Sequence, residues 1–167
     1  MRVLHLSTLW TVLLDILAWL VIHLAVVAVM IRVPRSRFDP EGFLYRARFW
    51  EKRGHLYTRW LRVRSWKAHM PDGAWLAGGR GFPKKTLEKK DRQHLKAFFV
   101  ETCRAELTHW VIILIAPLFF LWNKTWVGWI MILYALAENM PLILVQRYNR
   151  QRFRRVLEMK GQETGKS

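Results

Sequence analysis

The feature that most constrains this chain is an almost unbroken apolar run over residues 3–33. A helix rises ~1.5 Å per residue, so a run of this length can cross a hydrocarbon core of ~30 Å. A cleaved signal peptide is the alternative, but the apolar region is long for one and Arg2 is the only charge ahead of it. We therefore predict an amino-terminal transmembrane helix. Asp15 and His23 lie inside it, where packing against other spans is favoured over a part in catalysis.

A second apolar region has the pattern of a hairpin, with arms at 110–122 and 126–145 around a short Asn-Lys-Thr turn. The first arm is short for a crossing, ~20 Å as a helix, and Pro117 interrupts it. It can borrow length from a helix that we expect to begin near Asp91 and to run through His109. Two full spans and a re-entrant hairpin both stay open at this point.

The positive charge of the chain is confined to one side of these apolar regions. Of 28 Lys and Arg residues, only Arg2 precedes the first run and only Lys124 lies between the hairpin arms. The positive-inside rule produces such one-sidedness, so the basic segments are expected in the cytoplasm. A net charge of +16 also suits nucleic acid, but no RNA- or DNA-binding motif accompanies it, and nucleic acid is not an expected partner. The single Cys103 excludes an internal disulfide and a thiolate zinc site.

Between the apolar regions lies a basic segment rich in aromatic residues. Asp39 followed by Pro40 has the pattern of a helix start, and we expect this helix to run to Lys52 and to stop at Gly54. A second helix is expected over 56–67, where aromatic and basic residues mix as in helices that lie at a membrane interface. A turn at 71–73 and a glycine-rich loop at 78–81 follow, and the loop is neither a P-loop nor a dinucleotide fingerprint.

These patterns together predict an all-α membrane protein. It has an N-terminal transmembrane helix, basic amphipathic cytoplasmic helices and a C-terminal apolar helical hairpin. The expected divisions are an anchor at 1–33, a basic cytoplasmic or interfacial segment at 34–105, the membrane hairpin at 106–146 and a basic cytoplasmic tail at 147–167.

The candidate chemistry lies where the hairpin begins. Residues 101–110, ETCRAELTHW, place two carboxylates, an arginine and a histidine against the apolar arm. On a helix Glu106 and His109 are one turn apart, and Glu101 and Arg104 have the same i,i+3 spacing. His109 beside a carboxylate can act as a general base, with the carboxylate holding its tautomer. A structural pair that satisfies a buried helix junction is the alternative.

The hairpin should bring these residues close to 146–150 at its other end, which is again rich in polar groups. Arg147, Arg150 and Arg154 form a cationic stripe suited to the phosphates of a lipid or of coenzyme A. Ordinary positive-inside anchoring explains the same stripe and is favoured. Glu106 and His109 also match one Glu-x-x-His element of di-iron proteins, but such sites need a second copy and two further carboxylates, so no metal is predicted. Asp72 in the 71–73 turn is another possible base, although turn formation is favoured.

Several separated motifs carry a resemblance to a known family. They are Trp50-Glu51-Lys52-Arg53-Gly54, Trp60, Val63-Arg64-Ser65-Trp66-Lys67, Asp72-Gly73, Glu101-Thr102-Cys103-Arg104-Ala105-Glu106-Leu107, His109-Trp110, Asn139-Met140-Pro141 and Gln146-Arg147-Tyr148-Asn149-Arg150. In this order they resemble the glycosyl-4,4'-diaponeurosporenoate acyltransferase family over about residues 32–155. The resemblance implies a bacterial membrane enzyme that esterifies a fatty acyl chain onto the primary hydroxyl of the glucose of a glycosylated C30 carotenoid acid. Such a step belongs to the synthesis of staphyloxanthin-like pigments.

We combine the resemblance with the chemistry above. The expected partners are the glycosylated carotenoid, an acyl thioester such as acyl-CoA as co-substrate, membrane lipids and other pigment enzymes, with no cofactor. The expected location is the bacterial cell membrane. Acyl transfer to another glycolipid or terpenoid glycoside is one alternative, and a non-catalytic scaffold or lipid-binding subunit is another. The catalytic candidates are His109, Glu106, Glu101 and Asp72, and the substrate-binding candidates are Arg104, Asn139, Gln146, Arg147, Asn149, Arg150 and Lys67.

Overall fold

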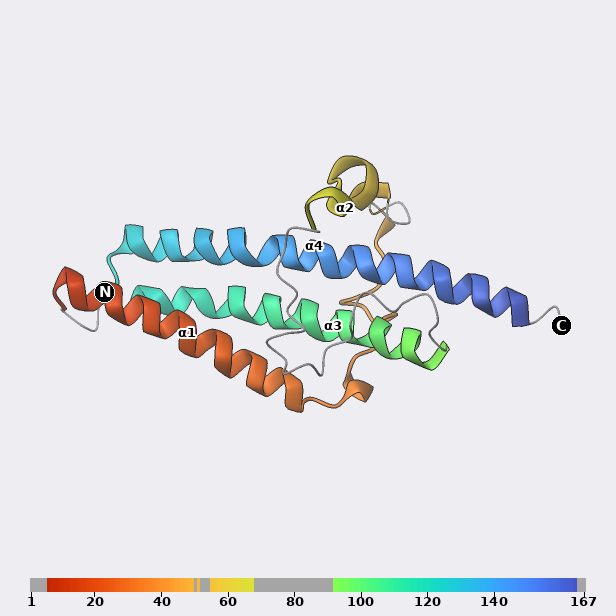
Figure 1. Ribbon diagram of the computed structural model, residues 1–167. Coiled ribbons are helices and arrows are strands. Elements are labelled where there is room, and N and C mark those ends of the chain that lie inside the picture. The colour runs from red at the N-terminus through yellow and green to blue at the C-terminus, as the bar shows by residue number, and fades with distance from the viewer. Residues whose placement is uncertain (1–5, 50, 52–54, 68–91, 165–167) are drawn as a thin grey trace. The chain divides into compact units, whose positions relative to one another are not determined.

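The structure, a computed structural model, describes residues 6–49, 51, 55–67 and 92–164. The regular elements among these residues are all helical (Figure 1). The longest are α1 (Thr8–Arg32), α3 (Arg92–Ile115) and α4 (Thr125–Thr164). The shorter ones are the 3₁₀-helices η1 (Arg35–Arg37) and η6 (Ala116–Leu121), the π-helix η3 (Leu56–Trp60) and α2 (Val63–Trp66). The predicted all-α fold is confirmed.

Among the described residues, three helices are long and apolar enough to cross a membrane. They cover Thr8–Arg32, Leu95–Leu121 and Thr125–Met159. On α1, side chains such as Leu9, Trp10 and Ile16 are more than 60% exposed, as expected of a helix that faces lipid. The predicted N-terminal transmembrane helix and apolar hairpin are thus confirmed as helices of spanning length and composition.

The chain divides into two compact units. The first unit comprises residues 1–37 and 104–143, and the second comprises residues 38–103 and 144–167. Both α3 and α4 contribute residues to each unit. We describe the two units separately.

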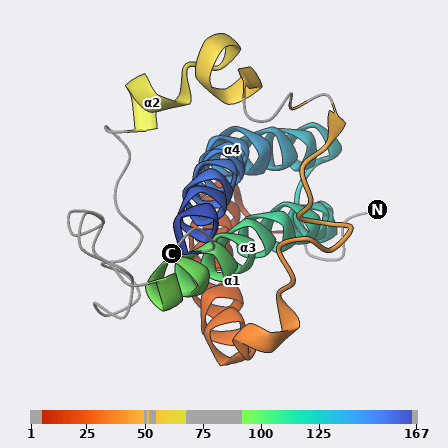
Figure 2. The ribbon, with the colours of Figure 1, turned by 90° about the vertical axis from the view of Figure 1, so that its right-hand side faces the viewer.

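In the first unit, α1, α3 and α4 run side by side (Figure 2). Trp19 of α1 stacks on Phe119 at 4.6 Å between ring centroids and meets Tyr134 edge-on at 5.3 Å. Its indole Nε1 also donates to Met131 Sδ at 3.4 Å. Buried Asp15 accepts hydrogen bonds from Trp122 and Asn123 at the hairpin turn, both at 2.7 Å. The two apolar regions of the sequence therefore pack on each other through specific polar and aromatic contacts.

The first arm of the hairpin is longer than the apolar run at 110–122, because the helix that leads into it is continuous with it. As predicted, one helix begins next to Asp91 and runs through His109, and α3 passes into η6 at Pro117. Gly128 then allows the second arm to approach closely, because a Cβ at this position would lie 2.3 Å from the Phe120 ring. Within α4, Pro141 lacks an N–H group, which leaves the carbonyl of residue 137 without its usual helical donor.

In the second unit, the helix predicted from Asp39 to Lys52 is wrong. The segment forms successive turns, in which the carbonyls of Asp39 and Gly42 accept from nearby amides, and Asp39 Oδ1 accepts from the amide of Glu41. Two carbonyls that a helix would need, those of Leu44 and Tyr45, instead accept from arginine side chains of α4. Tertiary hydrogen bonds therefore replace the helical ones that the local pattern favours.

The predicted helix over 56–67 is present only in part. It breaks at Arg62, which has a left-handed conformation with φ 44° and separates η3 from α2. The break turns Tyr57 and Val63 into a small core with Val145 and Tyr148 of α4. Packing against α4 thus overrides a continuous amphipathic helix. The predicted turn at 71–73 and the glycine-rich loop at 78–81 lie outside the described residues.

Candidate active site

His109 of α3 is held by Asn139 of α4 inside the first unit. Nδ1 of His109 lies 2.9 Å from Oδ1 of Asn139. The amide Nδ2 of Asn139 donates to the carbonyl of Ala135 at 2.9 Å, one turn earlier in α4. Asn139 is 1% exposed, so both ends of its amide are used within the protein.

This geometry determines which nitrogen of His109 carries the proton. Because the amide N–H of Asn139 is directed at Ala135, only the amide oxygen faces the imidazole, and an amide oxygen can only accept. Nδ1 of His109 must therefore be the donor, and Nε2 of the neutral ring carries the lone pair. The described residues provide no hydrogen-bond partner for Nε2. A histidine with this tautomer has the form of a general base.

A second histidine stands beside this pair in the first unit. Nδ1 of His23 in α1 lies 2.8 Å from the carbonyl oxygen of Trp19. Because a carbonyl oxygen can only accept, Nδ1 is the donor in this hydrogen bond. Its Nε2 lies 3.8 Å from Glu138, the residue that precedes Asn139 in α4. Three helices thus bring ionisable groups together in an apolar unit, which is unusual unless the groups are paired or used.

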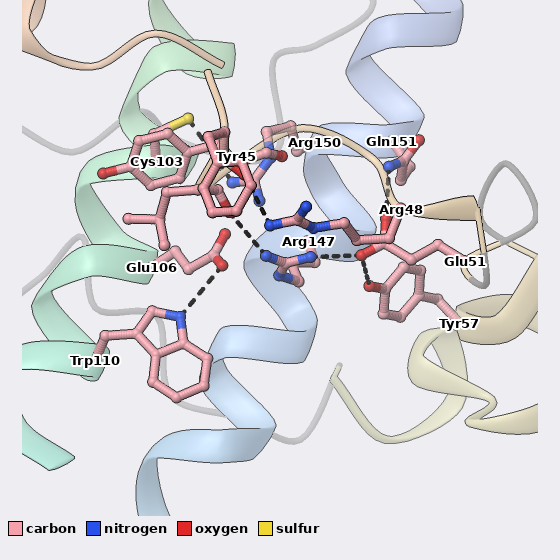
Figure 3. Close-up of polar contacts among 12 residues, drawn as sticks. Tyr45, Arg48, Glu51, Tyr57, Cys103, Glu106, Trp110, Arg147, Arg150 and Gln151 are labelled. Atoms are coloured by element: carbon pink, nitrogen blue, oxygen red, sulfur yellow. Dashed lines mark hydrogen bonds and ion pairs between the residues drawn. The ribbon is translucent and has the colours of Figure 1, made fainter. Parts of the chain in front are cut away.

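Glu106 is buried completely on α3. Its Oε1 accepts from the indole Nε1 of Trp110 at 3.3 Å (Figure 3). The residue that hydrogen-bonds His109 is therefore Asn139, and the expected orientation of His109 by Glu106 is replaced by this contact. Arg104, one turn before Glu106, donates to the carbonyl of Val33 at 3.0 Å, just beyond the end of α1.

In the second unit, Glu51 is the centre of a saturated polar cluster (Figure 3). The Glu51 carboxylate is 1% exposed and forms an ion pair with Arg147 of α4. It also accepts from Tyr57 Oη at 2.9 Å and from Gln151 Nε2 at 3.0 Å. Burial, together with the neighbouring Glu51 carboxylate, raises the pKa of Tyr57 well above its ordinary value of 10.0, so Tyr57 stays a hydrogen-bond donor at neutral pH. The cluster clamps the 44–51 segment onto α4.

Two more basic residues of the second unit, Arg150 and Lys67, form hydrogen bonds with other residues of the protein. Arg150 is 2% exposed, donates to the carbonyl of Tyr45 at 3.1 Å and approaches the buried Cys103 Sγ at 3.8 Å. Lys67 donates to Asn149 Oδ1 at 2.9 Å and lies 4.6 Å from the centre of the Tyr148 ring. These contacts connect Tyr45, Lys67 and the α3 residue Cys103 to α4.

Metal ligands do not gather in the part of the chain that the structure describes. There, no group of three or more His, Cys, Asp or Glu side chains is placed to hold an ion.

Comparison with known proteins identifies the family. The family model described as glycosyl-4,4'-diaponeurosporenoate acyltransferase matches residues 40–159. A relative with this name from Staphylococcus aureus strain Newman is 34% identical over 149 residues, which cover 86% of this chain and 88% of the relative. A second one, from Staphylococcus aureus strain bovine RF122 / ET3-1, is 33% identical over 143 residues and 84% of each chain. No solved structure matches.

This chain belongs to the glycosyl-4,4'-diaponeurosporenoate acyltransferase family. The resemblance predicted from the separated motifs is therefore confirmed. As a member of this family the protein is an acyltransferase.

The structure places the candidate residues of this acyltransferase as follows. It joins His109 to Asn139 and Lys67 to Asn149. Glu101 and Gln146 are partly buried on α3 and α4. Asp72 lies outside the described residues. The expected proximity of 106–109 to 146–150 joins residues of different units and stays a prediction.

Sequence reasoning missed the polar residues that organise the second unit. Glu51, Tyr57 and Gln151 form its central cluster but were not among the candidates. A weak signal was present, because Glu51 is the only acidic residue in a long basic stretch from 42 to 71. The contact of His23 with Glu138 was likewise beyond the sequence, since it joins residues more than a hundred positions apart.

Proposed function

We propose that this acyltransferase esterifies a fatty acyl group onto the primary hydroxyl of the glucose in glycosyl-4,4'-diaponeurosporenoate, a glycosylated C30 carotenoid acid. The support is the family description and the identical name of the Staphylococcus aureus relatives. The three helices of spanning length suit this pair of substrates, because a polyene and an acyl chain are long and apolar. The acyl donor is a thioester such as acyl-CoA, which carries an already activated acyl group and needs no cofactor.

The observation that carries the mechanism is the contact of His109 Nδ1 with Asn139 Oδ1 at 2.9 Å, from which we infer the tautomer of His109. Its Nε2 lone pair removes the proton from the glucose hydroxyl while the hydroxyl oxygen attacks the thioester carbonyl. The tetrahedral intermediate places a negative charge on the former carbonyl oxygen. When it collapses, the carbon–sulfur bond breaks, the ester remains, and the proton on Nε2 passes to the leaving thiolate.

Asn139 is a positioning residue in this mechanism. By accepting from Nδ1 it keeps the proton off Nε2 and fixes the plane of the ring. Arg104 is the proposed cation for the developing oxyanion or for the donor. Arg147 and Arg150 donate to Glu51, Leu44 and Tyr45, so we assign them the role of holding the 44–51 segment in place.

We further propose that the basic segments lie on the cytoplasmic side of the bacterial cell membrane. Their one-sided distribution supports this orientation. It would also give the enzyme access to a polar thioester donor that cannot cross the bilayer. Other pigment enzymes in the same membrane are the proposed source of the glycosylated acceptor.

The direct test is mass spectrometry of pigment from a host that makes the glycosylated carotenoid acid. Expression of the wild-type chain should add the mass of one fatty acyl group. The variant His109→Ala should leave the glycoside unmodified while remaining in the membrane fraction. His55→Ala is a matched control, because His55 is exposed next to η3 in the second unit.

Two results would overturn parts of this proposal. Full esterification by His109→Ala would remove His109 as the base. An unchanged glycoside with wild-type protein in the membrane would exclude this acceptor, and a screen of other glycolipids would then separate a different acceptor from a scaffold without activity.

A further inference from the structure

The second unit contains an open hollow of about 390 Å³ lined by Thr58, Arg62, Arg64 and Ser65. Its size lies within the range of small-molecule sites, roughly 300–1,000 Å³. All four of these side chains are polar, two are cationic, and none is a carboxylate. The chemistry of the lining therefore favours an anion.

Arg62 and Arg64 differ from the arginines of α4 in the same unit. Arg147 and Arg150 donate to Glu51 and to the carbonyl of Tyr45, and Arg154 pairs with Glu41 at 2.8 Å. By contrast, the described residues provide no acceptor for either guanidinium at positions 62 and 64, and both side chains are exposed. Arg62 and Arg64 therefore remain available to a ligand, and both line the hollow.

The backbone of the hollow is held in a defined shape. The carbonyl of Arg62 accepts from both the amide of Ser65 at 2.9 Å and its hydroxyl at 2.7 Å. Trp66 Nε1 donates to the carbonyl of Leu61 at 2.8 Å, and Val63 is fully buried in the core. This turn keeps Arg62 in a left-handed conformation that non-glycine residues rarely adopt.

The two hydroxyls of the hollow are already used as donors. Ser65 Oγ donates to the Arg62 carbonyl, and Thr58 Oγ1 donates to the carbonyl of His55 at 3.3 Å. Each hydroxyl has a single proton, so neither can donate to a bound anion without breaking its present bond. Recognition therefore depends on the guanidinium groups, whose paired N–H donors match the oxygens of a phosphate.

We propose that this hollow is the subsite for the phosphate groups of the acyl donor, with Arg62 and Arg64 as the ligand-binding residues. The proposal rests on the proposed function, because it assumes a thioester of a phosphate-bearing carrier such as coenzyme A. The same chemistry would recognise the phosphate of an anionic lipid headgroup, and the experiment below separates the two sources.

The test measures binding of coenzyme A to the full-length protein in phosphatidylcholine nanodiscs, by calorimetry and without any acceptor. The double variant Arg62→Asn, Arg64→Gln should weaken binding about tenfold, and each single variant about threefold, since the groups are exposed and partly screened. Asparagine tolerates the left-handed conformation at position 62, and Arg64→Gln alone leaves that position untouched. Arg59→Gln is the control, because it removes the same charge from η3 outside the hollow.

Activity adds a second readout. The double variant should raise the KM for acyl-CoA by a similar factor of about ten and leave kcat unchanged, because these arginines bind the donor but do not touch the reacting carbonyl. A fall in kcat at unchanged KM would overturn the assignment.

The lipid source is tested by native mass spectrometry of the same variants from phosphatidylglycerol nanodiscs. If the double variant keeps its affinity for coenzyme A but loses retained phosphatidylglycerol, the donor subsite is overturned and the site is one for a lipid headgroup. If neither ligand responds, or if wild-type protein binds neither, the phosphate site itself is overturned. Because coenzyme A binding needs no carotenoid, these outcomes are independent of whether the proposed acceptor is right.

Discussion

The two units use the same kinds of polar residue in different ways. In the second unit Glu51 receives Arg147, Tyr57 and Gln151, so both of its carboxylate oxygens are occupied. In the first unit His109 hydrogen-bonds Asn139 through Nδ1, and its second ring nitrogen has no hydrogen-bond partner among the described residues. A saturated network stabilises a fold, whereas a group with one unused and correctly protonated atom can react. The comparison is consistent with a structural role for the Glu51 cluster, and it is the basis on which we propose His109 as the base.

The largest expected effect comes from breaking the saturated cluster. Glu51→Leu should destabilise the protein by about 3–5 kcal/mol, because the Arg147 guanidinium, which is 12% exposed, would lose the buried carboxylate that it pairs with. Thermal unfolding in detergent, followed by tryptophan fluorescence, measures the loss. Adding Arg147→Met should restore most of the stability, since removing both charges also removes the desolvation penalty. If the double variant is as unstable as Glu51→Leu alone, the loss of the ion pair is not the main cause of the destabilisation.

A somewhat smaller effect is expected from removing the hydrogen bond that holds His109, the proposed base. Asn139→Ala removes the acceptor for Nδ1 of His109, so the ring can rotate and change its tautomer. We expect kcat to fall about 10- to 100-fold at nearly constant KM, in line with the contributions of groups that orient a base. Asn139→Asp keeps an acceptor and should retain more activity. Equal losses in KM and kcat would indicate a general packing defect.

The polar contact at the hairpin turn gives a further comparison within the first unit. Asp15→Ala leaves the partly buried indole N–H of Trp122 and the buried amide of Asn123 without their shared acceptor, which should cost about 1–3 kcal/mol. Asp15→Asn retains an acceptor and should cost less. Unfolding midpoints of the two variants test this order, and equal midpoints would contradict a role for the hydrogen bonds.

The smallest effect is expected for Tyr57→Phe. It removes one of several donors to Glu51 and should destabilise the protein by about 0.5–1.5 kcal/mol. Because the folded-state pKa of Tyr57 lies above its ordinary value of 10.0, the stability linked to this group is fully present below pH 10 and is lost as the pH rises further. Stability measured across that range should therefore fall more steeply for the wild-type protein than for Tyr57→Phe. Parallel curves would contradict the coupling of Tyr57 to Glu51.

The sequence was sufficient wherever a long apolar pattern decided the structure. The helix at 8–32, the helix entering the hairpin from 92 and the turn at 123–125 follow from apolar length and from the need to satisfy backbone hydrogen bonds within a helix. His109 was identified as the candidate base from its place at the start of the hairpin. The family could also be predicted, because several short motifs occur in one order.

Local patterns were insufficient where tertiary contacts compete with them. The start signal at Asp39 and Pro40 is a real local preference, yet guanidinium groups from α4 take the carbonyls that a helix would have used. The same competition breaks the 56–67 helix at Arg62, where burial of Tyr57 and Val63 outweighs helical continuity.

The sequence by itself thus determined an all-α membrane protein of this acyltransferase family, and it predicted a catalytic histidine where α3 enters the apolar region. Only the tertiary structure decided that Asn139 holds this histidine, that Glu51 pairs with Arg147, and that Arg62 and Arg64 line one hollow. The physical reason is one of range. Hydrophobic length and helix periodicity act between near neighbours in the chain, whereas hydrogen-bond satisfaction is settled between helices whose partners lie 30 to more than 90 residues apart.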